Sequence, residues 1–148
     1  MREVIYAMRF RGQAEPVGAV GNVLKAITSA PSSTFTSSIR PDGLVSQLAL
    51  VEGGEASFAS EVTFTGETSF QEVGTIRFGD GNQLRFSTVG SGYLAPSADP
   101  ARKQGTVMWR VDGGEGQFSE ASGLITSNFF VDDQLGVTDH HLGVLLLP

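Results

Sequence analysis

The segment VTFTGETSFQEVGTIRFGDGNQLRFSTVG, residues 62–90, alternates apolar and polar residues on either side of two glycine-containing turns. Alternation with a period of two is the pattern of a β-strand that has one buried face. If the first turn lies at residues 66–67, Phe64 pairs with Phe70. Because side chains alternate between the two faces of a strand, this register points Glu72 along the apolar face.

The second turn of this segment contains GDGN, residues 79–82. A three-residue loop at 80–82 places Ile76 beside Phe86, whereas a two-residue loop would pair Ile76 with Arg85. Since the faces of a hairpin must match, the three-residue loop is favoured. The segment is therefore predicted to be a meander of three antiparallel strands.

The same period continues through most of the chain. One segment, residues 17–27, is the sole candidate for a helix, and its two glycines make a single turn equally consistent. Many short strands at regular spacing are typical of a sandwich or barrel. We predict one all-β domain over residues 1–148, an up-and-down antiparallel β-barrel of about eight to nine strands. The expected strands cover residues 3–11, 33–39, 44–51, 56–65, 69–78, 83–90, 105–111, 117–131 and 136–147.

Two nearly identical phrases stand sixty residues apart, VEGGEASF at 51–58 and VDGGEGQF at 111–118. Paired glycines permit the positive φ angles of a tight hairpin, so each phrase is predicted to turn between two strands. The phenylalanine that ends each phrase is expected to plug one end of the barrel. Duplication and convergent turn chemistry explain the repeat equally well.

The composition narrows the classes of partner. The chain has 148 residues, a net charge of −6 and only two lysines, which disfavours nucleic acid and anionic membrane surfaces as partners. It has no cysteine, so disulfides and thiolate chemistry are excluded. The charged N-terminal residues lack an apolar signal-peptide core, and we expect a cytoplasmic protein. No motif indicates a cofactor or a metal.

The segment MWRVDGGEGQFSEASGLIT, residues 108–126, is similar to part of the allene oxide cyclase-like and dirigent-like small β-barrels. In those families a Trp-containing strand runs into a glycine-rich turn with a phenylalanine, and Ala-x-Gly and another strand follow. The similarity extends over about residues 104–128, and Glu115 stands where those families usually have threonine. The resemblance implies an eight-stranded barrel, often trimeric, with a cavity for an apolar or phenolic molecule. It carries over no catalytic residues.

Three residues are candidates for catalysis. Burial of Glu72 would raise its pKa and suit it to general acid–base chemistry; the alternatives are a position in water or a pair with an arginine. Glu120 and Asn128 share a face with Phe118 if Gly123 makes no bulge, and would then orient a substrate inside the barrel. A core hydrogen-bond network or a solvent-exposed position explains that pair equally.

Aromatic and aliphatic residues on the expected inner face are candidates to contact a ligand. The two adjacent histidines, His140 and His141, point to opposite faces of a strand and are expected in a turn or on the surface, so they cannot readily hold one metal. Asp139 and His140 form a weaker alternative as an acid–base dyad. The predicted ligand-contacting residues are Tyr6, Phe70, Ile76, Phe86, Trp109 and Phe130.

Three functions are consistent with these patterns. The first is a barrel that binds an apolar or aromatic small molecule in its interior, and the second is a cofactor-independent cyclase, isomerase or dehydratase that uses an interior carboxylate. The third is a solid barrel that serves in assembly. Because residues 144–147 are apolar on both faces of a strand, we also predict a homo-oligomer, a dimer or a trimer.

Overall fold

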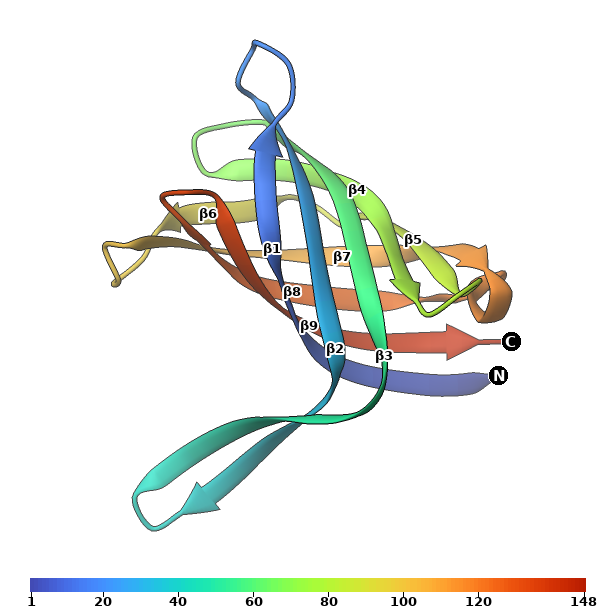
Figure 1. Cartoon of the computed structure of the whole chain (residues 1–148). Helices are drawn as coiled ribbons and strands as arrows, with labels where there is room; N and C mark the ends of the chain where they lie inside the picture. Colours follow the sequence, from blue (N-terminus) through green and yellow to red (C-terminus); the bar gives the residue numbers. More distant parts are fainter.

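The computed structural model describes all 148 residues and consists almost entirely of antiparallel strands (Figure 1). A single 3₁₀ turn, η1 (Gly116–Phe118), interrupts the strands. The all-β prediction is confirmed. The strands are β1 (Arg2–Pro16), β2 (Val23–Arg40), β3 (Gly43–Phe64), β4 (Ser69–Phe78), β5 (Gln83–Thr88), β6 (Gly92–Pro96), β7 (Arg102–Glu115), β8 (Ser122–Asp132) and β9 (Gly136–Leu147).

The sheet closes on itself as a barrel. Its order is β3-β2-β1-β9-β8-β7-β5-β4, and β3 pairs with β4 to complete a ring of eight strands. The ninth strand, β6, also lies between β4 and β7, so the two short strands β5 and β6 share one position in the ring. The predicted antiparallel barrel of eight to nine strands is confirmed.

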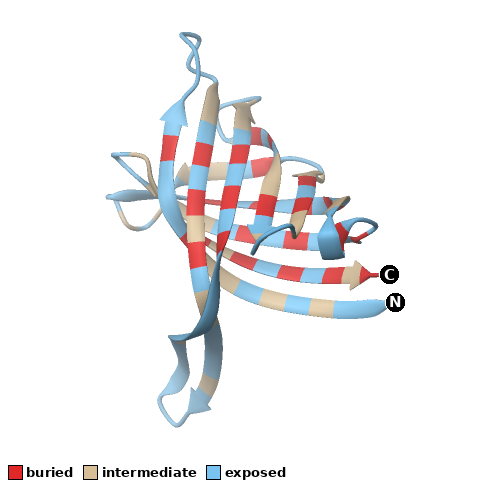
Figure 2. Ribbon diagram, turned by 45° about the vertical axis from the view of Figure 1, so that its right-hand side comes forward, coloured by how far each residue is buried: buried red, intermediate tan, exposed pale blue.

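Inward and outward side chains alternate along every strand of the barrel, as the banding in Figure 2 shows. The half near the chain termini is densely filled by aromatic rings. Trp109 is fully buried there and packs against Phe86 with ring centroids 4.3 Å apart. Phe118 of η1 is buried against Phe78 and covers this end, which confirms the plug predicted for that phenylalanine.

The outer halves of β2 and β3 leave the barrel as a two-stranded ribbon, which we call the arm (residues 31–55; Figure 1). The predicted strands 33–39 and 44–51 form it, joined by the predicted turn at residues 40–43. The strands predicted at 44–51 and 56–65 are continuous in β3. Most of the arm is exposed.

The structure corrects three local predictions. Residues 17–22 form a loop and β2 begins at Val23, so the helix considered for residues 17–27 is absent. The first glycine-rich phrase, residues 51–58, contains no hairpin; it crosses the bend where the arm meets the barrel, and Gly53 has φ 155° there. Only the second phrase ends a strand.

The register of the first predicted hairpin is confirmed, and that of the second is shifted. Phe64 pairs with Phe70, as predicted. In the next hairpin Ile76 pairs with Leu84 and not with Phe86, because the turn begins at Gly79, where φ is 82°. This register differs from the predicted one by two residues, which leaves every side chain on its predicted face. No helix in the structure has the length and hydrophobicity needed to cross a membrane.

Candidate functional site

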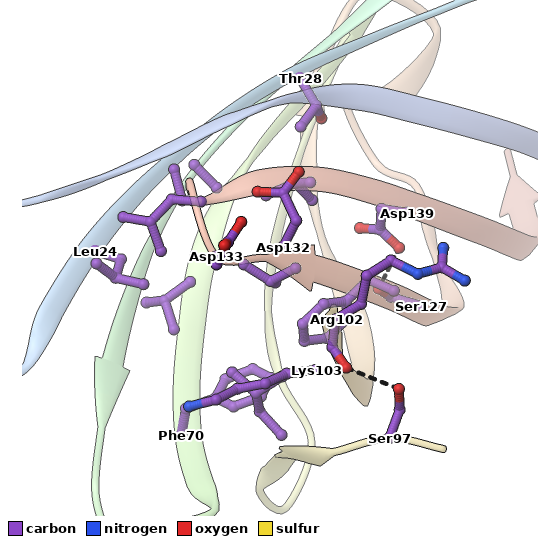
Figure 3. A pocket seen from close by; sticks show the side chains of 18 of the residues that line it. Leu24, Thr28, Phe70, Ser97, Arg102, Lys103, Ser127, Asp132, Asp133 and Asp139 are labelled. Atoms are coloured by element: carbon purple, nitrogen blue, oxygen red, sulfur yellow. Dashed lines mark hydrogen bonds between the residues drawn. The ribbon is translucent and has the colours of Figure 1, made fainter. Parts of the chain in front are cut away.

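A cavity of about 590 Å³ occupies the half of the barrel away from the termini (Figure 3). Its walls are mostly apolar, and its polar groups lie in two places, deep on the barrel wall and around the mouth. The deep wall carries two carboxyl groups. The lining residues include Ala14, Ala26, Thr28, Phe58, Phe70, Glu72, Leu94, Phe129, Ser127 and Asp139. The mouth is bordered by Asp99, Arg102, Lys103, Asp132 and Asp133.

Glu72 of β4 is one of the two deep carboxyl groups, and only 6% of the residue is exposed. The Ser60 hydroxyl donates a hydrogen bond of 2.6 Å to Oε2 of Glu72. Removal from water raises the pKa of Glu72 to about 8; the Ser60 hydrogen bond lowers it and the charge of Asp139 raises it. Glu72 is therefore mostly protonated at neutral pH.

Asp139 of β9 is the second deep carboxyl group. The Ser127 hydroxyl donates to its Oδ1 at 2.6 Å (Figure 3). Nε2 of His141 lies 2.9 Å from its Oδ2. A carboxylate only accepts hydrogen bonds, so His141 carries its proton on Nε2. Nδ1 can then accept a hydrogen bond from the Tyr6 hydroxyl, which lies 3.5 Å away.

His141 is enclosed by aromatic rings behind Asp139. Its imidazole stacks on Phe10 with centroids 4.2 Å apart, and the edges of Phe58 and Trp109 complete the enclosure. Burial and the charge of Asp139 raise the pKa of the Tyr6 hydroxyl, so this phenol stays protonated. Asp139 and Ser127 are the members of this chain of hydrogen bonds that line the cavity.

Two buried polar atoms near the deep wall make no hydrogen bond of normal geometry. They are Oγ1 of Thr28, which lines the cavity, and Nε1 of Trp109. A weak polar interaction of Trp109 lowers the pKa of Glu72 slightly, so the indole N–H is an unsatisfied donor near that carboxyl group. Buried donors and acceptors without a partner are costly, and the Thr28 hydroxyl is available to a molecule inside the cavity.

The mouth of the cavity carries charges of both signs (Figure 3). Arg102 bridges to Asp99 at 3.0 Å, and its guanidinium lies 3.8 Å above the ring of Phe130. The hydrogen bond from the Ala101 amide, followed by that from Arg102, lowers the pKa of Asp99. Because Asp99 and Arg102 are both well exposed, their pairing contributes little to stability.

The predicted catalytic residues separate into one inside the barrel and two outside it. Glu72 points inward, as predicted. The predicted inward orientation of Glu120 and Asn128 is wrong. Phe118 belongs to the turn η1, and β8 begins only at Ser122, so the face of Phe118 does not continue along the strand. Glu120 lies in an exposed turn and Asn128 faces out.

The predicted ligand-contacting residues also divide. Phe70 lines the cavity. Phe130 is on the outer face beneath Arg102. The other four belong to or pack against the aromatic core and do not line the cavity; they are Tyr6, Ile76, Phe86 and Trp109.

Sequence reasoning missed His141 and Ser127 and gave Asp139 the wrong partner. The two histidines do point to opposite faces of β9, but His141 is fully inside the barrel and pairs with Asp139, whereas the dyad hypothesis pairs Asp139 with His140. Asp139 and His141 are in phase with Leu145 and Leu147, but residues 144–147 are apolar on both faces of the strand, so the sequence did not indicate which face is the inner one. No three His, Asp or Glu side chains come together as a metal site.

Comparisons with known proteins concern the fold alone. No family model matches the chain, and no curated protein matches its sequence. Among solved structures, the chain is similar to the pterocarpan synthase dirigent protein GePTS1. The superposition has a TM-score of 0.48 and 14% sequence identity, and it covers 97% of this chain and 88% of that one.

Proposed function

We propose that the barrel binds a small, uncharged apolar or aromatic molecule that carries a hydroxyl or carbonyl group. The observation that carries this proposal is a cavity of about 590 Å³ with apolar walls and a few polar groups on its deep wall. Cavities of this size and composition are typical of small-molecule sites. The aromatic walls favour a flat ring, which stacks on rings such as Phe70 and Phe129.

The deep polar groups define what the ligand presents to them. Protonated Glu72 donates a hydrogen bond from Oε1 to a ligand oxygen, and Thr28 offers an unused hydroxyl. An anionic ligand would meet the carboxylate of Asp139. An uncharged ligand with an oxygen at one end therefore fits best.

Titration with the neutral dye Nile red tests binding. Ala26→Leu adds a larger side chain to the cavity wall, and Ala59→Leu makes the same change on the outer face of the neighbouring strand. We expect saturable binding with one dye per chain, which Ala26→Leu weakens at least about tenfold and Ala59→Leu leaves unchanged. Equal binding by both variants, or no saturation, would contradict the proposal.

A second candidate function is acid–base catalysis in the same cavity, favoured by the two different deep carboxyl groups. Glu72 is held protonated, while Asp139 receives hydrogen bonds from Ser127 and His141. In the loss of water from a bound β-hydroxy carbonyl compound, Glu72 would protonate the departing hydroxyl and Asp139 would accept the α-proton. The electrons of the C–H bond form the C=C bond as water leaves, and no cofactor is needed. This pairing of an acid with a base suits a dehydratase, isomerase or cyclase.

Base-catalysed elimination of 5-nitrobenzisoxazole tests this candidate function. This neutral aromatic probe opens to a phenolate nitrile when a base removes one proton. We expect turnover that Asp139→Asn reduces at least about tenfold while Nile red binding persists. Turnover no faster than with free acetate would contradict catalysis and leave the binding proposal intact.

A further inference from the structure

The arm presents an apolar face that meets the barrel only at its base, where the ring of Phe35 lies edge to face with His140 at 6.1 Å between centroids, and that is uncovered toward the tip. Register pairs Ile39 with Leu44 and Phe35 with Leu48, and side chains at alternate positions share a face. Ile39 is 91% exposed, Leu44 75% and Leu50 70%. The opposite face is more polar, and both faces meet solvent (Figure 2). It carries Thr34, Thr36, Ser38 and Gln47 together with the smaller apolar residues Val45 and Ala49.

An isolated ribbon of this kind has no source of stability within one chain. Two strands alone are marginally stable in water, and an exposed apolar face adds no favourable burial. The outer edge of each strand of the arm also has no neighbouring strand to pair with. Beyond Ser29, β2 no longer pairs with β1, and β3 pairs with β4 only from Ala56 onward.

The departure of the arm leaves a matching open edge on the barrel. The first half of β1, residues 2–10, pairs with β9 on one side and with nothing on the other. A groove of about 520 Å³ runs between this edge and the base of the arm. Four consecutive residues on each side form its walls, 5–8 of β1 and 32–35 of β2, together with Val51.

Apolar residues continue from this groove across the outer surface of the barrel. Ile5 pairs with Val144, which in turn pairs with Leu124 on β8. Ala7 and Leu142 form the adjacent row. Ile5 is 60% exposed, and Leu142, Val144 and Leu124 are each between 42 and 50% exposed. We call the groove and this surface the acceptor site.

We propose that the acceptor site of one chain receives the arm of a second copy of the same chain, and that the exchange is mutual. The arriving strand pairs its backbone with the free edge of β1 and places alternate apolar side chains against the acceptor site, which is the general mode of β-strand addition. A chain cannot satisfy itself in this way, because its own arm is one wall of its groove and projects away from the barrel (Figure 1).

The available area supports a second copy as the occupant. A large apolar side chain has about 100 Å² of surface to bury, so the exposed parts of the arm and acceptor side chains provide roughly 500 Å² per chain. Stable interfaces bury about 800 Å² per partner, of which about 60% is apolar. When two chains exchange arms, each chain buries both its arm and its acceptor site, and the apolar area reaches that size. A single contact of one arm with one acceptor site buries only about half of that area.

Analytical ultracentrifugation of the full chain tests the proposal. We expect a mass of twice 15.6 kDa at micromolar concentration. Ile39→Asp/Leu44→Asp removes the tip of the apolar face, and Ile5→Asp alters the acceptor site; each should weaken self-association at least about 100-fold. The control Thr36→Asp/Gln47→Asp makes the same paired change on the polar face of the arm and should keep the wild-type mass.

Mixing the Ile39→Asp/Leu44→Asp variant with the Ile5→Asp variant tests whether the arm of one chain binds the acceptor site of the other. Each is expected to be monomeric alone. The mixture should form heterodimers through the one intact arm and the one intact acceptor site, at a higher concentration than the wild type needs, because only one of the two contacts remains. A monomeric wild type would overturn the proposal and indicate that a different protein covers the arm. An Ile5→Asp variant that keeps the wild-type mass would overturn it in favour of contacts between arms. Circular dichroism and Trp109 fluorescence check that each variant keeps the barrel.

Discussion

Replacing Glu72 by glutamine is expected to stabilise the protein, by an amount that depends on pH. The folded pKa of Glu72 is about 8 and the ordinary value is 4.5, so between these values the folded state holds a proton that the unfolded state has released. The free energy of unfolding then falls as pH rises through this window, by about 1.4 kcal/mol per pH unit. Glutamine keeps the shape of the protonated acid and does not titrate.

The gain from Glu72→Gln follows from this window. It is close to zero at pH 4, roughly 3 kcal/mol at pH 7 and levels off at about 5 kcal/mol above pH 8. Urea unfolding at several pH values measures it, and the fluorescence of Trp109, which is the single tryptophan and is fully buried, reports the transition. The exposed Glu61 on β3 provides the control, since Glu61→Gln should change stability by less than about 0.5 kcal/mol at any pH.

Parallel stability curves for wild type and Glu72→Gln would refute the reasoning. They would mean that Glu72 titrates near its ordinary value, as a carboxyl group does in contact with water. The protonated donor that the proposed ligand site uses would then be absent at neutral pH.

Three further substitutions test the pKa of Glu72 and the backbone conformation at Gly123. Ser60→Ala should raise the pKa of Glu72 further and Asp139→Asn should lower it, because the first removes a hydrogen bond to the carboxylate and the second removes a neighbouring negative charge; NMR titration of the side-chain carboxyl carbon measures both. Gly123→Ala should destabilise the barrel by about 2 kcal/mol in urea unfolding, since φ is 136° and the added Cβ would meet the Val144 carbonyl oxygen. Unchanged stability of that variant would contradict the close approach of Gly123 to the backbone of β9.

Local pattern was sufficient to predict the fold and one half of the site. Closely spaced strands with short turns have few alternative registers, so Phe64 opposite Phe70 already placed Glu72 on the inner face. The hairpin after it shows the limit of this reasoning. A shift of two residues preserves every face, so alternation alone cannot distinguish Leu84 from Phe86 as the partner of Ile76.

The other half of the site depends on ring closure and on backbone conformation, which a pattern of residues does not reveal. Tyr6 and His141 meet because β1 and β9 pair at opposite ends of the chain. Glu120 and Asn128 were misplaced because the 3₁₀ turn η1 ends at Phe118 and β8 begins only at Ser122, so the inward position of Phe118 does not set the phase of β8. Alternation alone does not show where a strand begins, so the sequence left both phases open.

The size of the inward side chains explains why one half of the barrel is filled and the other hollow. In the half near the termini, the rings of Phe86, Trp109 and Phe118 occupy the interior. Toward the other end the inward positions of β1 and β2 are Ala14, Ala26 and Thr28, and β8 contributes Ser127.

Eight strands enclose just enough space for large side chains to fill, so small ones leave a void. Such a void forfeits packing energy, and a chain selected only for stability would fill it. Small residues gathered at one end, around a buried carboxyl group whose pKa is about 8, are instead what a binding cavity requires. The void and the buried acid lie on the same wall, and both destabilise the empty barrel. A bound ligand would fill the void and form a hydrogen bond with the acid, so binding would stabilise the folded state on both counts.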